Sequence, residues 1–265
     1  MITLAVSGAA GRMGRAIVEA SQLAADIRLG CAIERSGSDV IGVDAGELAG
    51  VPGIGVVVSD VLDREAFDVL IEFTNPGATL EHVGFCADHD KAMVIGTTGL
   101  QPADHEQIAR AADTIPIVLA PNMSVGVNVC LRLLEIAARA LGDSVDIEII
   151  EAHHRHKIDA PSGTALRMGE VISAARGRAL HEDAVFVRSG AVGERPRHAI
   201  GFATVRAGDI VGEHTVMFVG DGERIELTHR AASRMNFAYG ALRAARWVSD
   251  RESGLYAMHD VLDLS

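Results

Sequence analysis

Short apolar runs alternate with segments of helical periodicity along the first half of the chain. Helix-like segments at 12–24, 78–90 and 104–114 separate these runs. Near-continuous runs of Val, Ile and Leu between helices are typical of a parallel sheet that is covered on both faces. The pattern therefore predicts a doubly wound α/β domain. The apolar runs are "ITLAVS" (2–7), "IRLGCAIE" (27–34), "VLIEFT" (69–74), "AMVIGTTG" (92–99) and "IPIVLAPN" (115–122).

The pattern changes near Ser124. "SVGVNVCLRLLEIAARAL" (124–141) predicts a long apolar helix, "VDIEIIEA" (145–152) a strand, and the region of about 163–176 a further helix. The chain then reads as strand at 184–190, 198–208 and 214–231. Within the last of these, Gly220-Asp221-Gly222 is a good hairpin turn.

These features predict an α+β domain with a largely antiparallel sheet over 125–233. The helical tail at 234–250 is expected to return to the first domain. The first domain is then 1–124, completed by 234–265. The segment 36–53, rich in Gly, Ser and Asp, is expected to be a surface loop.

Composition agrees with two modest globular domains in a chain of 265 residues. Apolar residues make up 48% and charged residues 23%, which is the profile of a folded protein rather than a disordered one. Apolar runs stay below the ~18 residues that would span a bilayer, so no membrane span is expected. Met1 leads directly into an apolar run without a basic segment, and three cysteines are scattered. A reduced, cytoplasmic protein is therefore expected.

The charge balance is acidic, with a formal net charge of −12. Such a balance disfavours nucleic acid and anionic membranes as partners. An anionic ligand would therefore need a local cationic pocket. Residues 153–157, "HHRHK", concentrate such groups and are called the cationic segment below.

Gly8, Gly11 and Gly14 form a G-x-x-G-x-x-G loop between the first predicted strand and helix. Glycines there let backbone N–H groups approach a pyrophosphate, whose charge the helix N-terminus offsets. Glu34 ends the next strand, where an acidic residue accepts hydrogen bonds from ribose hydroxyls. The spacing departs from the commoner G-x-G-x-x-G, and a tight turn without a ligand is the alternative. The order of the elements nevertheless favours a Rossmann-type dinucleotide-binding domain.

Arg35 directly follows Glu34. Glu34 would repel a 2′-phosphate and Arg35 would attract it, so the pair suggests that both NADH and NADPH are used. Alternatively, Arg35 is ordinary surface charge. The loops "GTTG" (96–99) and "APNMS" (120–124) follow two further parallel strands, where small polar residues would line the nicotinamide.

Three interpretations of the cationic segment are open: a metal site, an anion site, and a solvated strand end. If the strand continues, His154 and His156 share one face and His153, Arg155 and Lys157 the other; otherwise the chain bends after His153. Arg155 and Lys157 would repel a cation, and neither an H-E-x-x-H motif nor a cysteine partner is present. Ser162 is a natural helix cap, so free N–H groups at Gly163 and Thr164 favour an anion-binding, acid–base site.

Two stretches, "VSGAAGRMGR" (6–15) and "EAHHRHKIDAPSGTAL" (151–166), closely resemble the 4-hydroxy-tetrahydrodipicolinate reductase (dihydrodipicolinate reductase) family. The resemblance extends to "IEFTNP" (71–76), "GTTG" (96–99), "APNMSVGVN" (120–128) and "ESGLYAMHDVL" (252–262). It implies an NAD(P)H-dependent cytoplasmic enzyme, usually a homotetramer, in the diaminopimelate route to lysine. The implied reaction reduces the cyclic dicarboxylate 4-hydroxy-tetrahydrodipicolinate to tetrahydrodipicolinate, with loss of water.

The resemblance also implies roles for individual residues. His153 would be a proton donor and acceptor and Lys157 a proton donor, while His154, Gly163 and Thr164 would hold the substrate. Family members often carry a further lysine beside the arginine, where this chain has Ser36, so the preferred cofactor stays open. The cofactor would be held by Gly8, Ala9, Ala10, Gly11, Arg12, Met13, Glu34, Arg35, Gly96, Thr97, Thr98, Ala120, Pro121, Asn122 and Met123.

The residue chemistry agrees with that resemblance. A dicarboxylate substrate explains a cationic site on an acidic protein. Hydride addition to a ring conjugated with an imine moves electron density toward the ring nitrogen, and a positioned acid must neutralise it. Two rival functions are a metal-dependent hydrolase using His153, His154 and His156, and a non-catalytic NAD(P) sensor. A sensor would have no need of Lys157, and no metal is expected.

Overall fold

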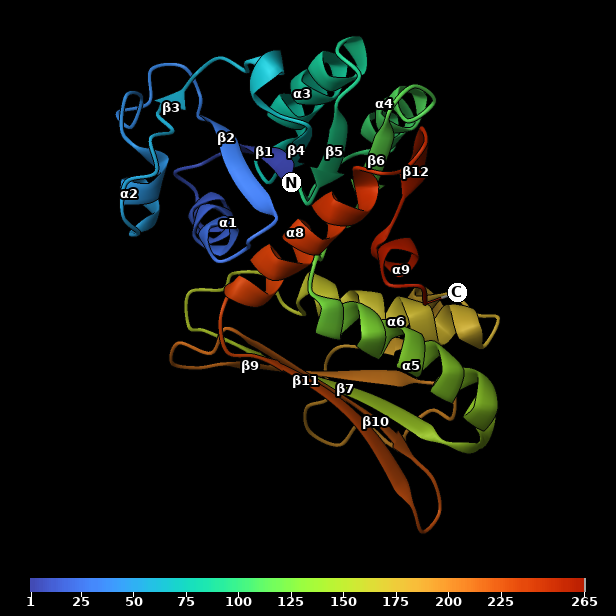
Figure 1. Ribbon diagram of the computed structural model, residues 1–265. Coiled ribbons are helices and arrows are strands. Elements are labelled where there is room, and N and C mark those ends of the chain that lie inside the picture. The colour runs from blue at the N-terminus through green and yellow to red at the C-terminus, as the bar shows by residue number, and fades with distance from the viewer. Residues whose placement is uncertain (265) are drawn as a thin grey trace. The chain divides into compact units, whose positions relative to one another are not determined.

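The computed structural model describes residues 1–264 and divides into two compact units. The first unit consists of Met1–Val125 together with the chain from Arg234 onward, and the second unit is Gly126–Ser233. Figure 1 shows the chain coloured from its N-terminus to its C-terminus, so that both segments of the first unit can be followed. The predicted α/β class, with a Rossmann-type first part and an α+β second part, is confirmed.

A parallel sheet forms the centre of the first unit, with strand order β12-β6-β5-β4-β1-β2-β3. Its central strands are buried on both faces, which explains their near-continuous apolar sequences. The strands are β1 Ile2–Ser7, β2 Ile27–Ile33, β3 Val58–Ser59, β4 Val69–Glu72, β5 Ala92–Ile95, β6 Pro116–Leu119 and β12 Gly254–Tyr256.

Helices pack on both faces of this sheet. Leu4 and Val6 face α1 and α8, whereas the intervening Ala5 belongs to the cluster that α3 and α4 cover (Figure 1). Successive strand residues point to opposite faces, so one short strand contributes to both cores. The helices are α1 Arg12–Gln22, α2 Ala45–Ala49, α3 Pro76–Asp88, α4 Pro102–Ala111, α8 Met235–Val248 and α9 Met258–Val261, with a 3₁₀ turn, η1, at Arg64–Ala66.

The segment 36–53 was predicted to be loop throughout, and that prediction is wrong for Ala45–Ala49, which form α2. Asp44 caps this helix, and its carboxylate accepts hydrogen bonds from the N–H groups of Gly46 (2.8 Å) and Gly55 (2.7 Å). Because Gly55 lies well outside the helix, the side chain closes the loop as well as capping the helix. Turn-forming residues dominate the local composition and obscured this helix.

A mixed sheet, with strand order β11-β10-β7-β9-β8, forms the centre of the second unit. Strand β10 pairs antiparallel with β7 and with β11, whereas β9 pairs in parallel with β7 and β8. Its elements are α5 Val125–Leu141, η2 Gly142–Ser144, β7 Asp146–His153, α6 Gly163–Ala175, α7 Leu180–Asp183, β8 Ala184–Val185, β9 Ile200–Arg206, β10 Gly212–Val219 and β11 Arg224–Ala231.

Helices α5 and α6 cover one face of this sheet (Figure 1). Ile147 and Ile149 of β7 pack there with Val216 and Phe218 of β10 and with Met168 of α6. The other face carries Ile150 and Val205, which are partly exposed. The alternation of buried and less buried residues along β10 reflects this difference between the two faces.

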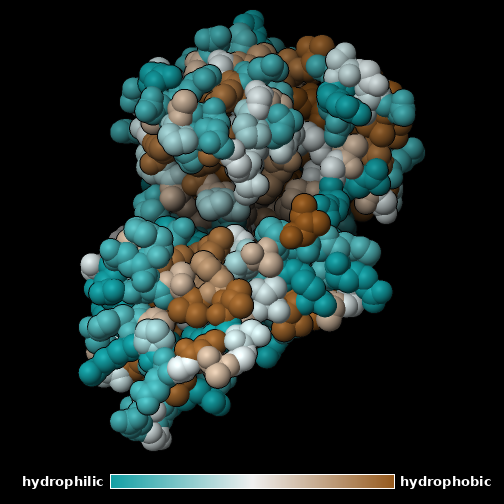
Figure 2. Space-filling view, turned by 180° about the vertical axis from the view of Figure 1, so that it is seen from behind, coloured by the Kyte–Doolittle hydropathy of each residue, from teal (hydrophilic) through white to brown (hydrophobic). Residues whose placement is uncertain are grey.

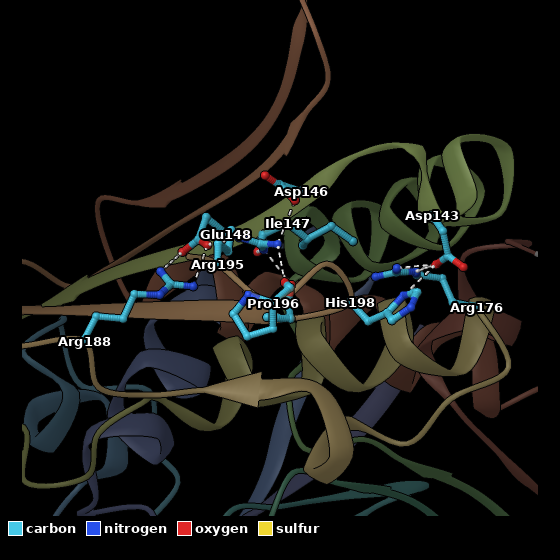
Figure 3. A network of polar contacts seen from close by, with 10 residues as sticks. Asp143, Asp146, Ile147, Glu148, Arg176, Arg188, Arg195, Pro196 and His198 are labelled. Carbon is cyan, nitrogen blue, oxygen red and sulfur yellow. Dashed lines mark hydrogen bonds and ion pairs between the residues drawn. The ribbon is translucent and has the colours of Figure 1, made fainter. Parts of the chain in front are cut away.

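Residues 184–190 were predicted to be strand-like, but β8 ends at Val185. Beyond it the chain is held by arginines rather than by a strand ladder (Figure 3). Arg188 donates to both oxygens of Glu148, each at 2.8 Å. Arg195 binds Glu148 and Asp146 and also donates to the carbonyl of Ile147. These contacts attach the irregular segment after β8 to the first residues of β7.

Within residues 1–264, helices that combine the length and the apolar character needed to cross a membrane are absent.

Candidate functional site

The glycine loop between β1 and α1 has a backbone that side chains would obstruct. Gly8 has φ = +68°, and a Cβ there would lie 2.9 Å from Cγ2 of Thr74. The Gly11 N–H donates to the Gly8 carbonyl at 2.9 Å. A Cβ on Gly14 would lie only 2.1 Å from that same carbonyl oxygen, so the helix can approach the loop closely only with glycine at this position.

Helix α1 begins directly after this loop, at Arg12, with Gly11 as its N-cap. In the part of the chain that the structure describes, no side chain caps it. A glycine cap leaves the first-turn N–H groups accessible to an anion, to which the helix dipole also contributes. The cradle therefore fits the pyrophosphate of a dinucleotide. Ala9 is buried below the loop, and Met13 is partly buried.

Glu34 lies beside the glycine loop, as the sequence predicted. Its Oε1 accepts a hydrogen bond from the Ala10 N–H at 2.9 Å, and its Oε2 accepts one from the Arg35 N–H at 3.2 Å. The carboxylate is thus oriented by the loop, while the Arg35 side chain is exposed. Both groups are placed at the end of β2, where an adenosine ribose would lie in this class of domain.

The other two predicted cofactor loops follow β5 and β6, at the same edge of the sheet. Thr97 is buried, and its hydroxyl accepts from the Thr74 N–H at 3.2 Å, whereas Thr98 is exposed. Gly96 packs against the Phe73 ring so closely that a Cβ would lie 2.1 Å from it.

In the loop after β6, Ala120 and Met123 are buried while Pro121 is exposed. The Asn122 side chain accepts from the Ser124 N–H at 2.9 Å and so holds the loop in a tight turn.

Sequence reasoning missed a polar cluster beneath these loops. Glu72, at the end of β4, is fully buried; it lies 2.5 Å from Nδ1 of His82 and accepts a hydrogen bond from the Thr74 hydroxyl. The buried acid holds Thr74 where it contacts Gly8 and Thr97. The run "VLIEFT" contains the signal, because an acid inside an otherwise apolar strand needs a partner.

The cationic segment bends after its first residue. Strand β7 ends at His153, and beyond it the Lys157 N–H donates to the His154 carbonyl at 3.1 Å. The second interpretation of the strand geometry, a bend after His153, is therefore the one that the structure adopts. The rings of His154 and His156 lie 6.2 Å apart, and the Lys157 ammonium donates to Asp159 at 2.8 Å.

A buried acid, Glu151, organises the base of this segment. It is 1% exposed, and its Oε2 lies 2.6 Å from Nδ1 of His153. Arg206 at the end of β9 donates to both carboxylate oxygens, each at 2.8 Å, and the Ser162 N–H donates to Oε1 at 3.1 Å. One carboxylate thus joins β7, β9 and the start of α6.

Ser162 caps α6 as predicted, because its Oγ accepts from the Ala165 N–H at 3.2 Å. Gly163 and Thr164 are the first residues of the helix, so their N–H groups lie at its N-terminus, where the helix dipole favours an anion. The Ser162 hydroxyl also lies 2.8 Å from Nε2 of His214 on β10. Burial lowers the pKa of His214 to about 4, so this imidazole is neutral at physiological pH.

Arg206 and His214 are the residues of this site that sequence reasoning missed. Arg206 is the register partner of His153 in the parallel ladder from β7 to β9, and His214 is that of Glu151 in the ladder from β7 to β10. Strand pairing brings them to Glu151, because both lie far along the chain from the cationic segment. Groups of three or more metal-ligating side chains are absent from residues 1–264.

The parallel sheet, its glycine loop and Glu34 define a class of protein: a dinucleotide-dependent oxidoreductase. Two family models match the chain, the N-terminal part of dihydrodipicolinate reductase at residues 2–123 and its C-terminal part at 126–262. The chain belongs to the dihydrodipicolinate reductase family. It is an NAD(P)H-dependent reductase of the diaminopimelate route to lysine, as the sequence resemblance implied, and its cofactor is a pyridine nucleotide.

Solved structures agree on the fold. A dipicolinate-bound dihydrodipicolinate reductase from Paenisporosarcina sp. TG-14 matches with a TM-score of 0.77 and 24% identity over 97% of each chain. A probable dehydrogenase from Thermotoga maritima matches with a TM-score of 0.63 and 12% identity, covering 99% of this chain and 93% of the other. An amine dehydrogenase from Mycobacterium smegmatis gives 0.59 and 13% identity, covering 97% and 95%.

Replacing Gly14 with alanine should weaken dinucleotide binding. The added Cβ would push α1 away from the Gly8 carbonyl and open the cradle. We expect the Kd for NADH to rise roughly 10-fold or more, which corresponds to about 1.4 kcal/mol. Gly84→Ala on α3 is the matched control, because an added Cβ there meets nothing within 4 Å. Calorimetric titration of both variants checks this; wild-type affinity in Gly14→Ala would contradict the role of the close contact.

Proposed function

We propose that the cationic segment and the first turn of α6 bind the cyclic dicarboxylate 4-hydroxy-tetrahydrodipicolinate. His154, Gly163 and Thr164 hold its carboxylates through an imidazole and through N–H groups at the helix N-terminus. The observation that carries the proposal is Glu151, which joins His153 to the N–H of Ser162, the cap of α6. Lys157 lies in the segment between them, in a protein of net charge −12. The related Paenisporosarcina reductase binds dipicolinate, which is also a cyclic dicarboxylate.

In this proposal, His153 and Lys157 transfer the proton that the reaction requires. His153 lies at the end of β7, held through Nδ1 by Glu151, so its Nε2 is the nitrogen that exchanges a proton. Lys157 carries an ammonium, which lowers the pKa of Asp159 beside it. A proton from either residue neutralises the electron density that develops toward the ring nitrogen. The overall balance takes up one hydride and one proton and releases one water.

We further propose that the three loops of the first unit hold the cofactor. Residues 8–13 receive the pyrophosphate, Glu34 and Arg35 the adenosine ribose, and 96–98 and 120–123 line the nicotinamide. The cofactor, when bound, supplies the hydride. The protein provides the cradle of glycines, the oriented Glu34 carboxylate and the dry floor formed by Ala9, Thr97 and Met123.

Both NADH and NADPH are proposed as cofactors. Glu34 accepts from ribose hydroxyls and repels a 2′-phosphate, whereas the exposed Arg35 guanidinium pairs with that phosphate. The two effects oppose each other, and Ser36 adds no charge to the balance. We therefore propose that NADH is used as well as NADPH or modestly better.

We propose that the protein is a cytoplasmic homotetramer that uses the helix-free face of the second sheet for assembly. Ile150 and Val205 on that face are partly exposed, and Ala203 and Thr215 flank Ile150 in the strand register. Apolar surface gathers on the second unit, in the lower body of Figure 2. Light scattering coupled to size exclusion tests the assembly, and a monomeric mass would contradict it.

Lys157→Ala should lower kcat about 10²–10⁴-fold, the usual contribution of general acid catalysis. Because Lys157 belongs to the substrate site, the Kd for NADH should stay near wild type. The assay is NAD(P)H oxidation with substrate made freshly from pyruvate and aspartate semialdehyde. Lys91→Ala, the chain's other lysine, controls for charge loss.

His153→Ala should behave similarly to Lys157→Ala, with a smaller change in kcat if Lys157 alone supplies the proton. Near-wild-type turnover of Lys157→Ala would contradict its role.

Arg35→Ala should raise KM for NADPH roughly 10-fold and barely change KM for NADH, since a charge-assisted hydrogen bond is lost only with the phosphorylated cofactor. Glu34→Gln keeps an acceptor for the Ala10 N–H but removes the charge, so preference should shift toward NADPH. Arg28→Ala, on strand β2 that precedes Arg35, serves as the control. Equal losses for both cofactors in Arg35→Ala would show that Arg35 packs on the adenine instead.

A further inference from the structure

The His153 ring is confined on three sides. Glu151 holds Nδ1 at 2.6 Å, and the His214 ring packs against it edge-on, with centroids 5.2 Å apart. On the third side lies Gly212 of β10, where a Cβ would come within 3.0 Å of Nε2. The ring therefore has little freedom to rotate, and its hydrogen bond to Glu151 determines which nitrogen is available.

Arg206 competes with His153 for the same carboxylate. Its guanidinium donates to both oxygens of Glu151 and also to the Asp159 carbonyl at 2.6 Å. Such a two-pronged pair is stronger and more directional than a single contact. The charge of Glu151 is thus already balanced by a permanent cation before His153 takes up a proton.

Glu151 is ionised in this arrangement. Burial raises the pKa of its carboxyl, but the hydrogen bonds from Arg206 and His153 outweigh burial and hold the pKa below its usual value. An ionised carboxylate can only accept hydrogen bonds. Nδ1 of His153 must therefore carry a proton, and the neutral form of His153 has its lone pair on Nε2.

We propose that Glu151 and Arg206 form a positioning pair for His153. Glu151 fixes the ring and its tautomer, and Arg206 offsets the carboxylate charge that would otherwise hold the imidazole protonated. The pair thereby leaves Nε2 of His153 as the nitrogen that both gives and takes the proton. The inference deepens the proposed function, on which it rests for the view that His153 transfers the proton.

The other titratable and charged groups around His153 do not reproduce this effect. His214 on β10 stays neutral above about pH 4, and the pKa of its register partner His229 on β11 is lowered by burial. Lys157 and Asp159, in the segment after β7, form their own ion pair. Glu151 on β7 and Arg206 on β9 therefore remain the charges that decide the protonation of His153.

Titration of His153 in the full-length protein by NMR of ¹⁵N-labelled imidazoles tests the proposal without any turnover. The imidazole resonances of His153 are assigned by their absence from the spectrum of His153→Gln. Glu151→Gln should lower the His153 pKa by about 1, because the neighbouring negative charge is lost. Arg206→Met should raise it by about 1 or more, because the carboxylate is left uncompensated. The double variant Glu151→Gln/Arg206→Met should return close to wild type.

Glu148→Gln is the matched control. Glu148 lies on the same strand and also binds an arginine through both oxygens, but it belongs to the network at the other end of β7 (Figure 3). The Glu148→Gln substitution should leave the His153 pKa unchanged. If Arg206→Met does not fold, Arg206→Lys should keep the wild-type pKa, and the sign of the change in Glu151→Gln still decides.

Shifts of the same sign in Glu151→Gln and Arg206→Met, or shifts smaller than those of Glu148→Gln, would overturn the proposal. A neutral tautomer with its proton on Nε2 in the wild type would do so as well. The acidic limb of kcat/KM should move with the NMR pKa. If the pKa values move as expected but the limb does not, the positioning pair stands and the proton-transfer role of His153 fails.

Discussion

A buried carboxylate is the constraint from which the second unit's site follows. Glu151 is almost fully removed from water, and a buried charge is tolerated only when it is paired and hydrogen-bonded. Its partners come from three separate elements: His153 from β7, Arg206 from β9, and the Ser162 N–H before α6. Satisfying one charge therefore sets the end of a strand, the ring of a histidine and the start of a helix together.

The first unit is under a different constraint, because a dinucleotide is bound mainly by backbone N–H groups rather than by side chains. Parallel pairing of β1, β2, β5 and β6 collects the loops that follow these strands at one edge of the sheet. Glycines allow the backbone to come close, and Glu34 is held in place by the N–H of Ala10. A second buried acid, Glu72, organises the polar floor beneath them. In both units a buried carboxylate near the end of a strand thus supports the neighbouring loop.

Charge is distributed accordingly. The acidic surface of the chain would repel a dicarboxylate, so its binding depends on a few local donors. In the proposed site, Lys157 and the first turn of α6 would supply these donors, and Arg206 offsets the charge of Glu151. The arginines around Glu148 neutralise the opposite end of β7 in the same manner, and there they order an irregular segment rather than a site.

Periodicity and turn chemistry in the sequence were sufficient to predict the two architectures, the glycine loop with Glu34, the Ser162 cap and the cationic segment. Those features are local, because each depends on neighbours within about one strand or helix of the chain. The helix at Ala45–Ala49 depended on Asp44, which also binds the N–H of Gly55 beyond the helix. The chain beyond Val185 is held by arginine contacts to β7 instead of continuing as a strand. Arg206 and His214 joined the site only through strand register, which no single-sequence pattern specifies. Tertiary structure therefore decided how His153 is held, because a buried charge must find partners wherever the fold supplies them.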